Sequence, residues 1–494
     1  MLLLGIDIGT SSVKLAIVDS ASQKTIITAQ YPEEESAIQA LKPGWAEQSP
    51  EMWWEHTQHA FAICKKKGVF NPLDISAIGI AYQMHGLVLV DKEQQLLRNS
   101  IIWCDSRAVA LGNEAFDELG HEYCLSHLLN SPGNFTASKL AWVKQNEPEV
   151  YAKIHKIMLP GDFIAMKLSS SITTSISALS EGIFWDFKTD TISASLMDHY
   201  GFDPEMIPEI RPVFSEHGTV SLSAAELLGL KSGIPVAYKS GDQPNNALSL
   251  NVLEPGEIAA TAGTSGVIYG LSDQLAYDPQ SRVNTFAHVN YTPEQKRLGT
   301  LLCINGTGSM NRWTKNLLTS GISYAEMNET AKKVAIGADG LRVLPFGNGA
   351  ERMLNNRLIG GHFHNIDFNL HTNAHIFRGV QEGIAFAFRY GLDIMCSNGL
   401  RPNVIRCGKA NLFLSELFLE AFVNSTGVPV ELYENDGSIG AALGAGIGAK
   451  IYARPAEAFS RMKPIQFTEP SLTSNYEQIY QDWLINLEAK ITQQ

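Results

Sequence analysis

The chain has 494 residues, of which 45% are hydrophobic and 18% charged, a balance typical of a globular protein with more than one domain. The formal net charge of −13 argues against a nucleic-acid partner, because phosphate backbones are bound by basic surfaces. Six scattered cysteines, an N-terminal apolar run interrupted by Asp7, and apolar segments all shorter than about 20 residues favour a cytoplasmic protein without disulfides, signal peptide or membrane partner.

The first predicted element is a β-hairpin, in which "LLLGIDIG" and "VKLAIVD" are strands joined by Gly9-Thr10-Ser11. The backbone N–H groups and hydroxyls of such a turn form a concavity that binds phosphate oxygens, and Lys14 would add a point charge. Asp7, at the end of a strand beside this turn, would organise a hydrated Mg²⁺. The alternative is an aspartate that only hydrogen-bonds its own turn.

Further along the chain, "EMWWEHTQHAFAICKKKG" has the apolar spacing of a helix. "ISAIGIAYQ" and "GLVLVD" are predicted strands, with Met84 and His85 between them. "VAYKSGDQPNNA" is a strand that delivers Asp242 to its end. Phosphoryl transfer to an alcohol needs a group that accepts the hydroxyl proton, which Asp242 could provide unless it is another turn aspartate.

A later segment repeats the design of the first hairpin. "EIAATAGTSGVIYG", residues 257–270, again places Gly-Thr-Ser between two strands, and Thr264 follows Thr10 by 254 positions. A motif that recurs at half the chain length indicates an internal duplication, with chance similarity as the alternative. Two such turns facing one another would hold a polyphosphate from both sides. "GAGIGAK" lacks the second glycine and the hydroxyl of a P-loop, so its small residues are expected to serve close packing.

Several segments, taken in order, resemble the FGGY carbohydrate kinases over nearly the whole chain. "GIDIGTSSVK" and "AGTSGV" are similar to the two phosphate hairpins of that family, and "YKSGDQ" to its catalytic strand. "PGWAEQSPEMWW", "YQMHG" and "IIWCDSRA" look like its xylulose kinase branch, while "FTASKLAWVKQNEPEVY" and "HTNAHIFRGVQEGIAFAF" resemble its two signatures. The resemblance implies an α/β protein of two actin-like, ribonuclease H-like ATPase domains with a cleft between them. The implied domains are a sugar-binding domain, residues 1–246, and a nucleotide-binding domain, residues 247–494.

The resemblance also implies roles for residues at matching positions. Asp242 would be the general base. The residues implied to line the sugar site are Met84, His85, Asp242 and Gln243, with Trp103, Asp105 and Arg107 nearby. The residues implied to contact the nucleotide are Thr10, Ser11, Lys14, Gly263, Thr264 and Gly308 at the phosphates and Gly408 near adenosine, with Asp7 at the metal.

The expected activity is transfer of the γ-phosphate of Mg-ATP to a ketose hydroxyl, with ATP and Mg²⁺ as cofactors and D-xylulose, phosphorylated at O5, as the sugar. Another ketose or a polyol, such as ribulose or sedoheptulose, is the first alternative. A catalytically idle sugar or nucleotide sensor and a filament-forming relative of actin are alternatives from other classes. The oligomeric state is left open, with a homodimer as one option.

Three departures from the family pattern affect these expectations. Cys407 and Lys409 replace glycines beside Gly408, which leaves the nucleotide open. Gln243 follows the catalytic aspartate where xylulose kinases usually have asparagine, which leaves the sugar open. The family's "GERTP" loop occurs as "GAERML", with Ala350 inserted. The histidines at 362, 364, 371 and 375 lack supporting acids or cysteines, so a zinc site is not favoured.

Overall fold

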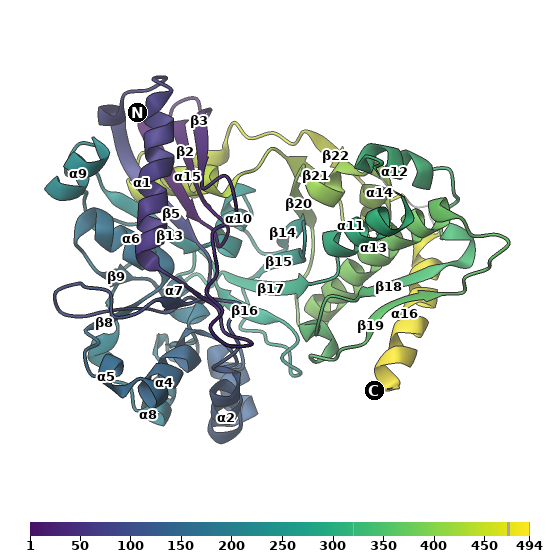
Figure 1. Cartoon of the computed structure of the whole chain (residues 1–494), viewed down its shortest axis with the longest axis horizontal. Helices are drawn as coiled ribbons and strands as arrows, with labels where there is room; N and C mark the ends of the chain where they lie inside the picture. Colours follow the sequence, from purple (N-terminus) through teal and green to yellow (C-terminus); the bar gives the residue numbers. More distant parts are fainter. Residues whose placement is uncertain (320, 472–474, 494) are drawn as a thin grey trace. The chain divides into compact units, whose positions relative to one another are not determined.

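The computed structural model describes residues 1–319, 321–471 and 475–493. The chain divides into two compact units, each discontinuous in sequence (Figure 1). Unit 1 comprises residues 1–253, 286–298 and 436–462, and unit 2 comprises residues 254–285, 299–435 and 463–494. The assignment of sugar binding to residues 1–246 and nucleotide binding to residues 247–494 stays a prediction.

Unit 1 is built on a five-stranded sheet with the order β13-β5-β1-β2-β3. Strands β13, β5 and β1 are parallel, whereas β2 and β3 continue as an antiparallel meander, so the predicted first hairpin is confirmed. The strands are β1 (Leu2–Ile8), β2 (Val13–Asp19), β3 (Thr25–Tyr31), β5 (Ile75–Tyr82) and β13 (Val236–Gly241).

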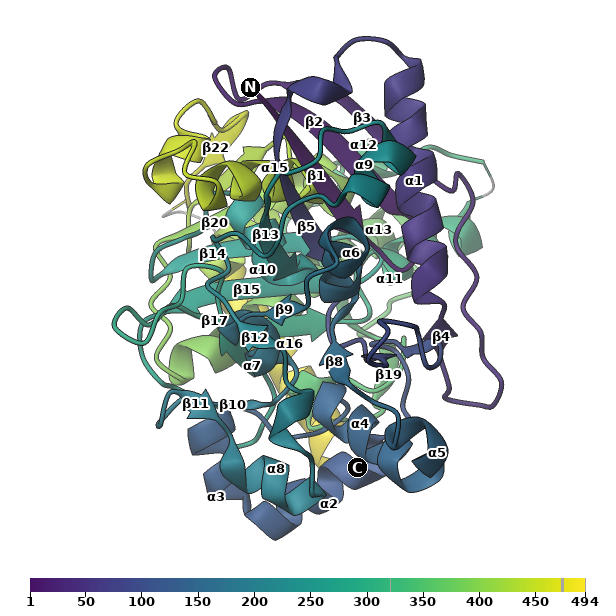
Figure 2. The same ribbon diagram turned by 90° about the vertical axis from the view of Figure 1, so that its left-hand side faces the viewer.

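Helices cover both faces of this sheet. Because side chains alternate between the faces of a strand, Leu4 and Ile6 of β1 enter a core with Trp53 of α1 (Pro50–Lys66) and with α6 (Pro160–Ser169). Leu3 points to the other face, where α15 (Gly437–Gly448) lies. Figure 2, which faces unit 1, shows α1 and α6 in front of the sheet and α15 behind it. The same alternation places Asp7 on the α15 face.

Helix α15 approaches the sheet too closely for side chains at two glycines. A Cβ on Gly5 would lie 1.8 Å from the Ser438 carbonyl oxygen, and one on Gly79 would lie 2.0 Å from that of Ala441. Within "GAGIGAK" itself, a Cβ on Gly448 would lie 1.7 Å from the Ala237 carbonyl oxygen, so the expectation that the small residues of this segment serve close packing is confirmed.

The remaining elements of unit 1 surround the sheet. Its short strands are β4 (Glu47–Gln48), β6 (Val88–Val90), β7 (Ser100–Ile101), β8 (Lys156–Met158), β9 (Thr173–Thr174), β10 (Trp185–Asp186), β11 (Thr191–Ile192) and β12 (Glu209–Ile210). Its further helices are α2 (Val109–Leu119), α3 (His121–Tyr123), α4 (Thr136–Asn146), α5 (Pro148–Tyr151), α7 (Ile176–Glu181), α8 (Ala194–Tyr200), α9 (Leu222–Leu228) and α10 (Asp242–Ser249).

Unit 2 is centred on a seven-stranded sheet with the order β16-β17-β15-β14-β20-β21-β22. The second predicted hairpin is confirmed as antiparallel β14 and β15, and β14, β20 and β21 are parallel. The order β21-β20-β14-β15-β17 thus corresponds to β13-β5-β1-β2-β3 of unit 1, which favours internal duplication over chance similarity. The strands are β14 (Glu257–Ala262), β15 (Gly266–Ser272), β16 (Asn284–Ala287), β17 (Leu298–Ile304), β20 (Val404–Gly408), β21 (Val430–Tyr433) and β22 (Gln466–Thr468).

A long central helix, α13 (Asn373–Ser397), carries much of the apolar core of unit 2. The other elements are a hairpin of β18 (Arg342–Phe346) and β19 (Gly360–His364) and the helices α11 (Gly308–Leu318), α12 (Tyr324–Ala331), α14 (Glu416–Thr426) and α16 (Tyr476–Thr492). In the described part of the chain, no helix is both long enough and apolar enough to span a membrane.

Candidate active site

Parallel strands of unit 1 end together and collect three of the predicted segments at one edge of the sheet. In the ladder Ile8 of β1 pairs with Tyr82 of β5, and Tyr82 pairs with Gly241 of β13. Asp7, the Met84–His85 segment and Asp242 therefore lie at the same carboxyl edge, where open α/β sheets bind their ligands.

Asp242 is the first residue of α10, directly after β13. Burial of its carboxylate and the negative charge of Asp7 raise its pKa to about 7, while hydrogen bonds from the backbone and side chain of Gln243 act in the opposite direction. A carboxylate that titrates near neutral pH is well matched to general-base catalysis. The side chain of Gln243 is engaged with Asp242 rather than standing apart from it.

Asp7 lies against the start of α15. A Cβ on Gly437 would be 2.4 Å from the Asp7 Oδ2 atom, so only glycine leaves room for this carboxylate. Burial and the charge of Asp436 raise the pKa of Asp7 to about 6, and Lys14, its partner in the ladder, opposes the rise. Asp436 also caps α15 by accepting the Ser438 N–H at 2.8 Å. Sequence reasoning missed Asp436, because nothing near it in the chain points to Asp7.

This acidic group fits a hard divalent cation. Mg²⁺ prefers carboxylate oxygens but keeps several waters, so one or two carboxylates suffice when phosphates supply further ligands. Within the described residues, no three His, Cys, Asp or Glu side chains gather in a group that could by itself hold a metal ion. Asp7 and its neighbour Asp436 match the donor type that a nucleotide-bound Mg²⁺ needs.

The first hairpin turn is fixed by its neighbours. The Thr10 hydroxyl donates to Gln83 Oε1 at 3.1 Å and accepts the Trp103 indole N–H at 2.9 Å. Gln48 donates to the Thr10 carbonyl oxygen at 2.8 Å. The hydroxyl of Thr10 is thus used within the chain, whereas Ser11 is exposed at the tip of the turn.

Met84 and His85 lie beside the strand that leads to Asp242. A Cβ on Gly241 would be 2.6 Å from Met84 Cγ, so Met84 lies directly against the end of β13. His85 has a left-handed backbone, with φ of 62°, and its Nδ1 lies 3.0 Å from the Glu181 carbonyl oxygen. Because a carbonyl oxygen only accepts, Nδ1 carries the proton and Nε2 is the acceptor atom of the ring.

Two buried ionisable residues that sequence reasoning missed hold His85 in place. Lys139 is 0% exposed and donates to the His85 carbonyl oxygen at 2.7 Å. Burial lowers the pKa of Lys139 to about 7, against the attraction of Asp105. Glu181 is 1% exposed, and its Oε1 accepts the His85 backbone N–H at 3.5 Å. Burial raises the pKa of Glu181 well above its usual range.

Asp105 and Arg107, predicted near the sugar, form a buried ion pair. Arg107 Nη2 is 2.6 Å from Asp105 Oδ2, and its guanidinium carbon lies 3.8 Å from the centroid of the Trp45 ring. Arg107 Nη1 also lies 2.7 Å from Glu47 Oε1, so the guanidinium group is paired with two carboxylates inside the protein and is placed to support the loop that carries Trp103. The Trp103 side chain itself is 53% exposed.

In unit 2, the second hairpin turn borders a cavity of about 320 Å³. Gly308 N–H donates to the Gly263 carbonyl oxygen at 2.9 Å, and Ser309 N–H donates to that of Thr264 at 3.1 Å. A Cβ on Gly308 would lie 2.3 Å from the Gly263 oxygen, so the start of α11 fits against the hairpin only as glycine. The cavity is lined by Ala262, Gly263, Thr264, Gly308, Asn311, Arg312, Tyr324, Asn328, Asn411, Leu412, Leu414 and Ser415.

Asn311 gives this cavity a polar group without a partner in the described structure. It is 6% exposed, and its Oδ1 atom accepts no hydrogen bond there. A buried unpaired acceptor in a cavity wall is suited to a ligand's donor. Gly408 ends β20 and is not among the lining residues; Asn411 and Leu412 of the following turn take that place.

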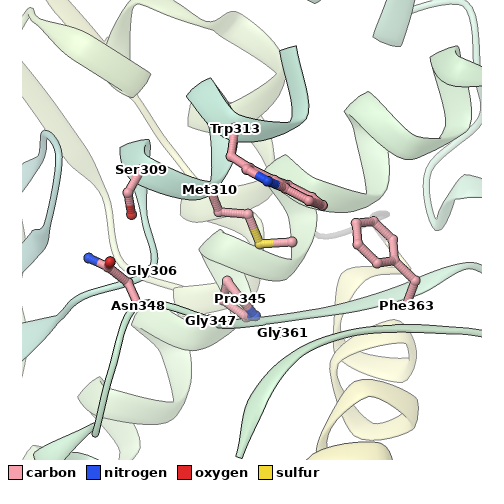
Figure 3. A pocket seen from close by; sticks show the side chains of 9 residues that line it. All are labelled: Gly306, Ser309, Met310, Trp313, Pro345, Gly347, Asn348, Gly361 and Phe363. Carbon is pink, nitrogen blue, oxygen red and sulfur yellow. The ribbon is translucent and has the colours of Figure 1, made fainter. Parts of the chain in front are cut away.

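A second cavity, of about 400 Å³, lies on the other side of α11 (Figure 3). Met310 and Trp313 of α11 face Phe363 of β19, while Ser309 and Asn348 lie at the opposite end. Trp313 is half-exposed. This cavity contains none of the residues predicted from the sequence.

The repeated strand order of the two sheets, with site residues at their carboxyl edges, defines the actin-like ATPase fold. Models of the N-terminal and C-terminal domains of the FGGY family of carbohydrate kinases match residues 2–249 and 258–449. The chain therefore belongs to the FGGY family and is a sugar kinase, and the resemblance stated from the sequence is confirmed. Kinases of this family use ATP and bind a sugar and a nucleotide.

Similar proteins extend over the full chain. The xylulose kinase of Escherichia coli K12 is 27% identical over 93% of this chain and 92% of its own. That of Haemophilus influenzae is 28% identical over 98% and 99%. The crystal structure of a xyloylose kinase from Brucella ovis is 25% identical, covers 100% of both chains and superposes with a TM-score of 0.90.

Proposed function

We propose that the protein transfers the γ-phosphoryl group of Mg-ATP to a ketose hydroxyl, with D-xylulose as substrate and D-xylulose 5-phosphate as product. The observation that carries the proposal is the juxtaposition of Asp242 with Met84 and His85 at one sheet edge in unit 1. The names of the similar proteins support xylulose as the sugar.

Asp242 is the proposed general base. It accepts the proton of the substrate hydroxyl while that oxygen bonds to the γ-phosphorus and the bond from the γ-phosphorus to the bridging oxygen of ADP breaks. Its pKa of about 7 leaves a large fraction ionised at neutral pH and still allows it to hold the transferred proton.

The proposed sugar contacts come from Met84, His85, Gln243 and Trp103. Met84 offers an apolar surface to the carbon skeleton, and His85 Nε2 accepts a hydrogen bond from a sugar hydroxyl. Asp105 and Arg107 act by supporting the Trp103 loop through their buried pair.

The proposed phosphate contacts come from the two Gly-Thr-Ser turns, through Thr10 and Ser11 with Lys14 in unit 1 and through Gly263, Thr264 and Gly308 in unit 2. Asp7, with Asp436 beside it, would hold Mg²⁺. When bound, Mg²⁺ neutralises charge on the phosphate oxygens. The unit 2 cavity beside Asn311 is the proposed place for the nucleoside, with Gly408 outside its wall.

Two alternative functions are each supported by a specific observation. A kinase for another ketose or a polyol, such as ribulose or sedoheptulose, is supported by Gln243, which binds the catalytic aspartate through a longer amide than asparagine. An idle sensor of the same fold is supported by the altered turn at Cys407 and Lys409, but it gives no role to the carboxylate that Asp242 places at the carboxyl edge of the sheet.

An ADP-release assay with Mg-ATP against ketoses, aldoses and polyols tests the proposal, with Asp242→Asn as the matched inactive control. Turnover on D-xylulose that Asp242→Asn abolishes is the expected result. Turnover on another sugar alone would retain the mechanism and reject the substrate. A folded protein without turnover on any sugar would reject the kinase proposal in favour of a sensor.

A cytoplasmic location is also proposed, supported by the six cysteines, none of which forms a disulfide within the described residues. A homodimer is retained as a proposal for the oligomeric state, to be tested by light scattering.

A further inference from the structure

The altered "GAERML" segment places a buried acid behind the loop that leads into α11. Glu351 is 1% exposed. Its carboxylate accepts the Asn305 backbone N–H at 3.0 Å from Oε1 and 3.2 Å from Oε2, and it also accepts the N–H of Gly306. One carboxylate thus holds two consecutive N–H groups of the loop between β17 and α11.

The same loop is fastened by other contacts. Asn305 Nδ2 donates to the Ala350 carbonyl oxygen at 2.9 Å, so the inserted alanine takes part in the contact. The Asn305 carbonyl oxygen accepts from Asn348 at 3.1 Å and from the Ser309 hydroxyl at 2.9 Å. Figure 3 shows Ser309 and Asn348 together at one end of the cavity beside α11. These hydrogen bonds fasten the loop to the 348–351 segment.

The next residues of the loop hold the second hairpin turn. The Thr307 hydroxyl donates to the carbonyl oxygens of Gly263 at 3.1 Å and Thr264 at 3.2 Å. Gly308 and Ser309 bind the same two oxygens through their backbone N–H groups. A shift of the loop would be transmitted directly to the turn at Gly263.

We propose that Glu351 is a positioning residue for the nucleotide, acting through Asn305 and Gly306 to set the turn at Gly263 and Thr264. The inference rests on the proposed role of that turn in binding nucleotide phosphates. Glutamine in its place would retain the shape but replace one of the two acceptor oxygens with an NH₂ group that only donates, so the two N–H groups would face one neutral acceptor oxygen in place of a carboxylate.

A contribution to stability alone is a poor explanation for a buried carboxylate at Glu351. Burial raises the pKa of Glu351 to about 7, so ionising this group inside the fold costs free energy. Glu382 provides the comparison within unit 2. It is also buried and accepts a backbone N–H, that of Gly337 at 3.0 Å, but it is paired with Arg378 at 2.7 Å and lies in α13.

The test measures ADP binding by calorimetry and both Michaelis constants at pH 8 with the full chain. We expect Glu351→Gln and Glu351→Ala to raise the Kd for ADP and the KM for ATP about tenfold or more, with the sugar KM unchanged. The matched control Glu382→Gln should lower Tm without changing the Kd for ADP.

An unchanged Kd for ADP in Glu351→Gln, with the wild-type protein binding ADP, would overturn the inference alone. Equal rises in the KM of ATP and of the sugar would overturn it in favour of a purely structural role. If the wild-type protein does not bind ADP, the proposed nucleotide role falls together with the inference. Should Glu351→Ala fail to fold, the isosteric Glu351→Gln carries the test.

Discussion

Asp7 and Asp242 stand at the carboxyl ends of the parallel strands β1 and β13, and the negative charge of Asp7 helps to raise the pKa of Asp242 to about 7. The two carboxylates are therefore not independent. One is proposed to serve the metal and the other the substrate proton, and the charge of the first adjusts the basicity of the second.

The pH dependence of sugar phosphorylation should reflect this coupling. Asp242 accepts a proton only when ionised, so kcat/KM should fall as the pH drops through about 7. Asp7→Asn removes one of the charges that raise the pKa of Asp242, so the acidic limb should move to lower pH at saturating Mg²⁺. A profile that is flat from pH 6 to pH 8 would contradict the role of Asp242.

Substitution of the proposed base should separate catalysis from binding. Asp242→Asn keeps the shape of the side chain but cannot accept the proton, so kcat should fall by about 10²–10⁴-fold. The Kd of the sugar, measured by calorimetry, should stay within about threefold. Asp117→Asn, at an exposed aspartate of α2, is the control and should leave kcat unchanged.

The same substitution should stabilise the protein at alkaline pH. The folded state holds the Asp242 proton up to about pH 7, whereas the unfolded chain releases it near pH 4, so stability is lost as the pH rises between these values. Asp242→Asn removes this loss. Its free energy of unfolding in urea should exceed that of the wild-type protein by about 1–3 kcal/mol at pH 8, and the difference should shrink at pH 5.5. An equal difference at both pH values would count against burial of the ionised group.

Lys139 should influence the sugar and not the nucleotide. Lys139→Met removes the donor that holds the His85 carbonyl oxygen, so the left-handed turn at His85 loosens. We expect the sugar KM to rise about tenfold, with the KM of ATP within about twofold. Lys167→Met, which breaks the partly exposed pair with Glu51, is the matched lysine control. A larger effect on ATP would relocate the sugar site.

Close packing under α15 gives a stability prediction. Gly5→Ala would place a methyl group 1.8 Å from the Ser438 carbonyl oxygen, so the helix or the strand must move. We expect a loss of about 3 kcal/mol in the free energy of unfolding. Gly361→Ala in β19 is the control, because its Cβ would meet only ordinary contacts at 3.7 Å. Similar unfolding curves for the two variants would contradict the packing.

Local patterns were sufficient to predict both hairpins and the position of Asp242 at the end of a strand. The signals for these features, apolar strand segments and Gly-Thr-Ser turns, lie in residues that are neighbours in the sequence. The residues around His85 could not be predicted in this way. Glu181 lies 96 positions and Lys139 lies 54 positions from His85 in the sequence. No motif around Glu181 or Lys139 indicates a contact with His85. Only the folded chain brings them together.

Asp105 and Arg107 illustrate a different limit. Their spacing of two residues agrees equally well with a sugar-binding pair and with an internal ion pair. In the structure the two residues form an ion pair. Trp45 and Trp142, which come from other parts of the chain, lie against the guanidinium group of Arg107. The spacing of Asp105 and Arg107 does not indicate that two distant tryptophans will pack against the guanidinium group.

The return of residues 436–462 to unit 1 has a consequence for biosynthesis. Helix α15 covers one face of the sheet whose first strand begins at Leu2, yet it ends at Gly448 of 494 residues. A ribosome making this protein must therefore synthesise the chain as far as Gly448, well past β13, before α15 can cover this face of the sheet. Until then the apolar face around Leu3 and Tyr238 is uncovered on the nascent chain. This face is where we expect a chaperone to bind during synthesis.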